Sequence, residues 1–112
     1  EKTEFTGKNA SLQKLLKKLK VKNQKAIIDS LENIESRHSI GFNKNVEKLF
    51  EIPVGEVFEK IKDFKETQYL IIDGILSQRL FSVIRSMKIK FIACKNKEQE
   101  LRVPDQVVVY FF

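Results

Sequence analysis

Four polar side chains near the middle of the chain offer the clearest chemistry in this sequence: Asp73, Ser77, Gln78 and Arg79. They follow the apolar run Tyr69–Ile72, which is typical of a strand buried on both faces, and they open a segment whose apolar residues have helical spacing. We expect the strand to stop at Asp73 and the helix to begin directly after it. The four side chains would then lie at the carboxyl end of a strand, where open α/β sheets bind their ligands.

Ser77, Gln78 and Arg79 place two polar groups and one permanent cation in the expected first turn of this helix. The backbone N–H groups at a helix start also point outward and attract negative charge. This combination predicts a modest anion site. The alternative for Arg79 is an ion pair with Asp73 or Glu66 that serves only the fold.

Asp73 has a functional and a structural interpretation. As a ligand it would hold a divalent metal ion or a ribose hydroxyl. As a structural residue it would accept N–H bonds from the first turn of the helix, with Gly74 permitting the bend. Metal-dependent phosphoryl transfer needs several converging carboxylates, and the next expected strand, Phe91–Cys94, has no acidic residue at its end. The structural interpretation is therefore favoured.

Two helices are expected before this region. Leucines at helical spacing predict a helix over residues 10–20, with Asn9 or Ser11 as its cap. A second apolar stripe predicts a helix over Asn23–Ser36, with its first residue as the N-cap. His38 then marks a helix end or a strand start rather than a ligand, because no partner residues surround it in sequence.

The rest of the chain alternates between extended and helical patterns. Extended segments are expected at 39–42, 46–52, 69–72, 88–94 and 106–112, and helical segments at 53–64 and 76–87. The first two extended segments form a hairpin, and the later order indicates βαβ crossovers. We therefore predict one α/β domain with a small, mainly parallel sheet, in which residues 1–37 are a helical lead-in and residues 38–112 are the α/β core. The direction of the last strand stays open.

The charge balance favours polyanionic partners, since the formal net charge is +6 and the pI is about 9.5. The cations form two groups along the sequence. The first group also fits the solvated faces of amphipathic helices, and its members are Lys14, Lys17, Lys18, Lys20, Lys22 and Lys25. The second group surrounds the last expected helix and the strand after it, and its members are Arg85, Lys88, Lys90, Lys95, Lys97 and Arg102.

Several classes of site do not fit the composition. The chain has one cysteine, Cys94, and one histidine, so a structural zinc site or an internal disulfide cannot be assembled, and the cysteine is expected to be a packing residue. No glycine-rich phosphate loop is present. The sequence shows neither a membrane span nor a signal peptide, which predicts a soluble, cytoplasmic protein without a membrane partner. Because the chain begins without methionine, we expect it to be a piece of a longer protein.

Two motifs carry a resemblance to a known family. Residues 52–57 (IPVGEV) followed by residues 70–80 (LIIDGILSQRL) resemble the C-terminal region of archaeal DnaG-type primases, outside the Toprim catalytic domain. The resemblance covers residues 39–112, and the pairing of Asp-Gly with Ser-Gln-Arg-Leu is its most specific part. The chain departs from the family at Ala93-Cys94, where a Val/Ile-Gly pair is expected.

The resemblance implies that the longer protein synthesises RNA primers with Mg²⁺ and, in archaea, associates with the RNA exosome as a component that binds adenine-rich RNA. The Toprim acidic motif is absent from this chain, so neither a catalytic residue nor a cofactor is expected in it. We expect an accessory domain that docks nucleic acid (RNA or DNA), the exosome or replication proteins. The contact residues would be Ser77, Gln78, Arg79, Arg85 and Lys88. The alternatives are a stand-alone basic α/β domain that binds RNA or a protein, and an enzyme that uses Asp73.

Overall fold

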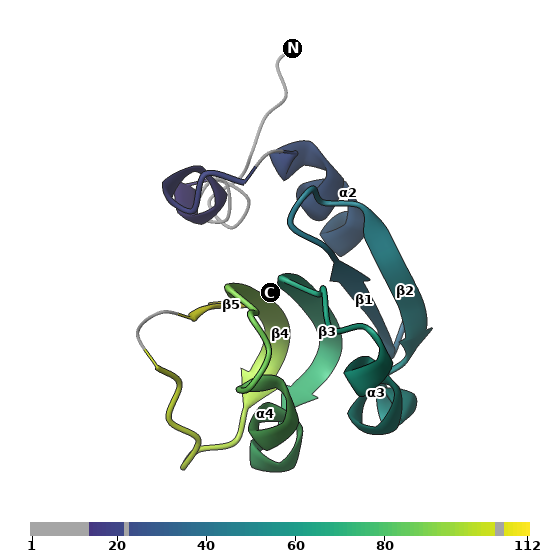
Figure 1. Ribbon diagram of the computed structural model, residues 1–112, viewed down its shortest axis with the longest axis vertical. Coiled ribbons are helices and arrows are strands. Elements are labelled where there is room, and N and C mark those ends of the chain that lie inside the picture. The colour runs from purple at the N-terminus through teal and green to yellow at the C-terminus, as the bar shows by residue number, and fades with distance from the viewer. Residues whose placement is uncertain (1–13, 22, 105–106) are drawn as a thin grey trace.

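A five-stranded sheet lies between two layers of helices in the computed structural model, which describes residues 14–21, 23–104 and 107–112. Residues 14–18 are helical, and the elements after them are α2 (Gln24–Asn33), β1 (His38–Phe42), β2 (Lys48–Pro53), α3 (Val54–Lys60), the 3₁₀ turn η1 (Ile61–Asp63), β3 (Tyr69–Leu76), α4 (Gln78–Ile84), β4 (Phe91–Lys97) and β5 (Val108–Phe111) (Figure 1). In the described part of the chain, no helix has the length and apolarity needed to cross a lipid bilayer.

The sheet order is β2-β1-β3-β4-β5, and the expected α/β class is confirmed. The sheet is mixed rather than mainly parallel, because β1 runs antiparallel to both β2 and β3, whereas β3, β4 and β5 are parallel. The cause is the hairpin: its first strand, β1, lies between β2 and β3 and is antiparallel to both, and α3 carries the chain past it from β2 to β3. The direction of the last strand, which the sequence left open, is parallel to β4.

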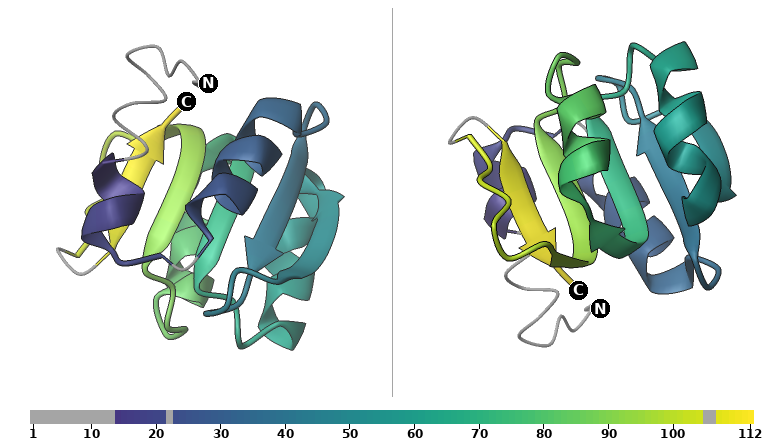
Figure 2. Two further views of the ribbon diagram at one scale, coloured as in Figure 1. Left: turned by 90° about the horizontal axis from the view of Figure 1, so that it is seen from above. Right: turned by 90° about the horizontal axis from the view of Figure 1, so that it is seen from below.

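Side chains on alternating positions of the central strands fill two separate cores. One core faces the N-terminal helical segment and α2, and it includes Leu16, Ile27, Leu31, Ile40, Tyr69, Ile71 and Phe91. The other faces α3 and α4, and it includes Val57, Ile61, Leu70, Ile72, Leu80, Ile84 and Ile92. Figure 2 shows the two helical layers from opposite sides of the sheet. Residues 69–72 are therefore buried on both faces, as their continuous apolar run predicts.

Helix α2 begins as its sequence predicts. The Oδ1 atom of Asn23 accepts the N–H of Ala26 at 3.2 Å, which confirms Asn23 as the N-cap. The expected caps of the preceding helix, Asn9 and Ser11, lie outside the described residues. The helical lead-in packs directly on the sheet through Leu16 and Ile27, so it supplies one complete layer of the fold.

Gly41 in β1 allows a close contact across the hairpin. It pairs with Phe50 of β2, whose ring lies over the glycine and packs against Phe64 with ring centroids 4.8 Å apart. A Cβ atom at position 41 would lie only 2.2 Å from Cε2 of Phe50. An aromatic ring that covers a glycine on a neighbouring strand is a known way to fill a sheet position that has no side chain.

Cys94 is a packing residue in β4, as expected. Its side chain is fully buried in the core that faces α3 and α4. Burial raises the pKa of the Cys94 thiol to about 11. The thiol is therefore protonated at neutral pH and is a poor nucleophile.

Candidate nucleic-acid interface

Asp73 lies inside β3 rather than at its end, which corrects the expected boundary between strand and helix. β3 pairs with β4 up to Ile72, passes through an irregularity at Asp73 and Gly74, and pairs again from Ile75 to Leu76. Two residues that take no part in the ladder let the strand bend and continue. The Asp-Gly pair therefore interrupts the strand without ending it.

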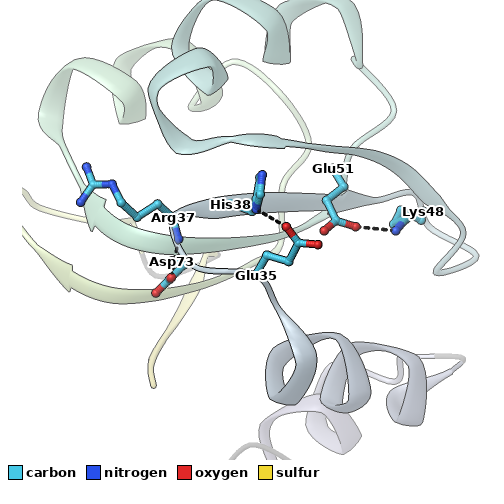
Figure 3. Close-up of polar contacts among 6 residues, drawn as sticks. All are labelled: Glu35, Arg37, His38, Lys48, Glu51 and Asp73. Atoms are coloured by element: carbon cyan, nitrogen blue, oxygen red, sulfur yellow. Dashed lines mark hydrogen bonds and ion pairs between the residues drawn. The ribbon is translucent and has the colours of Figure 1, made fainter.

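Asp73 fixes the connection between α2 and β1. Its Oδ2 atom accepts the backbone N–H of Arg37 at 2.7 Å (Figure 3). Arg37 has a φ of 62°, in the left-handed region that costs energy for a residue with a side chain. Oδ1 also lies 4.0 Å from Nζ of Lys95. Asp73 is therefore not the cap of α4 that the structural interpretation expected, because Ser77 has that role; the hydrogen bond of Asp73 is to the turn before β1.

Within the described residues, no group of three or more His, Cys, Asp or Glu side chains is placed to hold a metal ion. His38 begins β1, as one of the sequence interpretations has it, and its Nδ1 lies 3.4 Å from Oε2 of Glu35 (Figure 3). On the other strand of the hairpin, Nζ of Lys48 is 2.6 Å from Oε1 of Glu51. The contact between Lys48 and Glu51 pairs charges of opposite sign.

The N-terminus of α4 is occupied by groups of the same chain. Ser77 is the N-cap, since its Oγ accepts the N–H of Leu80 at 3.0 Å. The N–H of Gln78 donates to Oε1 of Glu98 at 2.6 Å. Sequence reasoning missed Glu98, although its position just after a strand parallel to β3 brings it to the same edge of the sheet. The expected anion site at this helix start therefore already holds a carboxylate.

Arg79 stacks on an aromatic ring of the neighbouring helix. Its guanidinium carbon lies 4.0 Å from the ring centroid of Phe58 in α3. This contact takes the place of the ion pair with Asp73 or Glu66 that the sequence suggested. A guanidinium over an aromatic face is attracted by the ring quadrupole and joins α3 to α4.

Replacing Arg79 with alanine is expected to lower the free energy of unfolding by about 0.5–1 kcal/mol, the usual size of an exposed cation–π contact. The measurement is urea unfolding followed by circular dichroism. Arg79→Lys is the matched control, because it keeps the charge but not the planar stacking. A larger loss of stability in Arg79→Lys than in Arg79→Ala would contradict the stacking role.

The expected contact residues do not form one site. Ser77, Gln78 and Arg79 lie at the start of α4, whereas Arg85 and Lys88 follow its end. The seven residues of the helix span about 10 Å between them. The second pair lies at the edge of the sheet where β3 and β4 begin.

A groove of about 780 Å³ lies at this second edge. We call it the lysine groove, and it is lined by Asn43, Lys44, Asn45, Lys62, Lys65, Glu66, Gln68, Val83, Ser86, Met87 and Lys88. Its walls come from the turn between β1 and β2, from η1 and the loop after it, and from the end of α4. Four of its lining residues are lysines and one is acidic, so it attracts anions.

The composition of the lysine groove favours contact with phosphates over contact with bases. No aromatic side chain is among its lining residues in the described part of the chain, so it offers no ring on which a base could stack. Lys44, Lys62 and Lys65 are all exposed and can reach a phosphate oxygen as point charges. Sequence reasoning named Lys88 but missed these three, because Lys44 and Lys65 lie in turns and Lys62 lies in η1, and only the strand order brings these segments together.

Comparison with known proteins gives a distant relationship. No family model matches the chain. It is 22% identical over 87 residues to the DNA primase DnaG of Thermofilum pendens and 30% identical over 70 residues to the DNA primase DnaG of Thermococcus kodakarensis. The matches cover 77% and 62% of this chain but only 20% and 15% of the two relatives. The chain is therefore distantly similar to a part of these DnaG primases and spans about a fifth or less of the length of the curated relatives it matches.

Proposed function

We propose that this chain is an accessory, non-catalytic domain of a DnaG-like primase, and that it contacts nucleic acid through the lysine groove. The observation that carries the proposal is the gathering of Lys44, Lys62, Lys65 and Lys88 around one groove, whose described lining includes one acidic residue, Glu66. The similarity to DnaG primases supports the choice of nucleic acid as the polyanion.

The contact would be made mainly to the sugar-phosphate backbone. Lysines neutralise phosphates and release counterions, which gives affinity without dependence on sequence. The amide of Gln68 adds a polar group to the lining of the same groove. Primer synthesis with Mg²⁺ and association with the RNA exosome or replication proteins belong to the proposed parent protein. This chain would contribute binding to them rather than catalysis.

We expect charge reversal in the lysine groove to weaken binding of RNA. The variant is Lys44→Glu with Lys62→Glu and Lys65→Glu, titrated against fluorescent oligoadenylate and a mixed-sequence RNA from about 50 to 200 mM salt. Loss of three phosphate contacts to a single strand should reduce the slope of log K against log salt by about 2. Both RNAs should respond alike, because the proposed contact reads no base.

The matched control reverses three exposed lysines of the N-terminal helical segment, Lys14, Lys17 and Lys18, which lie on the opposite layer of the fold. It changes the net charge by the same amount and should keep most of the salt slope. If both triple variants lost the same RNA affinity and salt slope, the effect would come from overall charge alone, and the proposal would be overturned. Loss of binding in Arg79→Ala alone would move the contact to the start of α4, and no binding by the unaltered chain at low salt would reject nucleic acid as the partner.

A further inference from the structure

A second groove lies beside the lysine groove and has a different character. It has a volume of about 430 Å³ and runs between the end of α4, the start of β4 and the segment before β5. We call it the apolar groove. Its partly exposed walls include Leu19, Met87 and Val107, and its floor includes the buried Ile89. Aliphatic side chains therefore line a surface that water reaches.

The apolar groove lies beside the crossover between β4 and β5, where residues 98–104 form no helix. β4 and β5 are parallel, and parallel strands are joined by a crossover that usually carries a helix over the sheet. In this crossover, residues 98–104 are not helical. As a result Val107 and Val109 pack on the core of this face but stay partly exposed. Near β5 this face is covered only in part: Leu101 is buried in the core and Val103 packs against it, but no helix of the described residues lies over Val107 and Val109.

The charged residues that line the apolar groove in the described part of the chain are all basic. Arg85, Lys88 and Lys90 are exposed lining residues, and no acidic side chain lines the groove in the part of the chain that the structure describes. A partner that fills this groove must bury apolar groups against the walls and present negative charge to the rim. An amphipathic peptide with aliphatic and acidic side chains satisfies both conditions.

We propose that the apolar groove docks an acidic, aliphatic segment of a partner protein, which covers the sheet where the crossover helix is absent. A nucleic acid fits this groove less well. Among the described lining residues the one aromatic is Phe81, which is only 6% exposed and offers no free face for base stacking. The inference goes beyond the proposed function, because it assigns a protein partner to a surface that adjoins the nucleic-acid contact.

The two grooves share Met87 and Lys88, so the test uses other residues. The probe is a phage-displayed library of short random peptides, selected on the full chain. Recovered peptides are then titrated by fluorescence anisotropy. Selection should enrich sequences that combine Leu, Ile or Val with Asp or Glu. Reversal of two rim charges, Arg85→Glu with Lys90→Glu, should weaken those peptides by about tenfold or more.

The matched control is Lys44→Glu with Lys62→Glu, which makes the same change in net charge in the lysine groove. It should change peptide affinity by less than about threefold, since only screened long-range attraction is lost. The proposal is overturned if no acidic, aliphatic sequence is enriched, or if the two double variants weaken the peptides equally. It is also overturned if oligoadenylate RNA, rather than peptide, responds to the Arg85 and Lys90 variant. None of these outcomes depends on whether RNA binds the lysine groove.

Discussion

Replacing Gly41 with alanine should lower the free energy of unfolding by about 2–3 kcal/mol, the upper part of the range for overpacking a core. The new methyl group would lie 2.2 Å from the Phe50 ring, far inside van der Waals contact. The ring cannot move away freely, because it is only 6% exposed and packs against Phe64. Urea unfolding followed by far-UV circular dichroism measures the loss.

The matched control is Gly55→Ala, since that glycine lies in α3 and a Cβ atom there would meet nothing within 4 Å. It should raise stability by about 0.5–1 kcal/mol through the better helix propensity of alanine. A second variant, Gly41→Ala with Phe50→Leu, should recover part of the loss, because a smaller side chain makes room for the methyl group. An unchanged stability in Gly41→Ala alone would show that β1 and β2 are not packed as described.

Asp73→Ala should cost about 2 kcal/mol, because it leaves the N–H of Arg37 without its charged acceptor and removes the group that holds the α2–β1 turn. Asp73→Asn should cost less, since the amide oxygen can still accept this bond. Urea unfolding measures both. A double-mutant cycle with Arg37→Gly tests the coupling, since glycine adopts the φ of 62° without strain and should make the turn less dependent on Asp73.

The cycle also separates the structural role of Asp73 from a metal-binding one. If the two changes add without coupling, the Arg37 contact contributes little and the structural role is rejected. If Asp73→Asn keeps full stability while abolishing a measurable affinity for magnesium, the metal interpretation replaces it. Isothermal titration with Mg²⁺ on the unaltered chain and on Asp73→Asn decides this point.

Local sequence patterns predict much of the fold correctly. The hairpin, the doubly buried run at residues 69–72 and the N-cap at Asn23 all follow from short-range periodicity and side-chain chemistry. These features depend on residues that are close in sequence. Strand direction does not, and the mixed sheet follows from the position of β1 between β2 and β3, which no local pattern encodes.

The error at Asp73 has a specific physical origin. An Asp-Gly pair after an apolar run is typical of a turn, but here it forms an irregularity through which the strand continues for two more paired residues. The partner of Asp73, the N–H of Arg37, lies 36 positions earlier in the chain. A contact of that separation cannot be read from spacing.

The candidate site was predictable only in part. Lys88 follows the end of α4 and could be named from the charge pattern. Lys44, Lys62 and Lys65 are distant from it in sequence, and the fold brings them to the same groove. The sequence does place basic residues in loops, and loops at one edge of a sheet converge. Which loops share an edge depends on the strand order.

The carboxylate of Glu98 competes with free anions for the backbone N–H groups at the start of α4. The carboxylate that accepts the N–H of Gln78 is tethered to the same domain, so its effective concentration at the helix start is on the order of millimolar or higher. A free phosphate group at micromolar concentration would have to displace the Glu98 carboxylate, which is covalently part of the same chain. If the proposed binding at the lysine groove is correct, the occupied start of α4 helps to direct anions to the opposite end of the same helix.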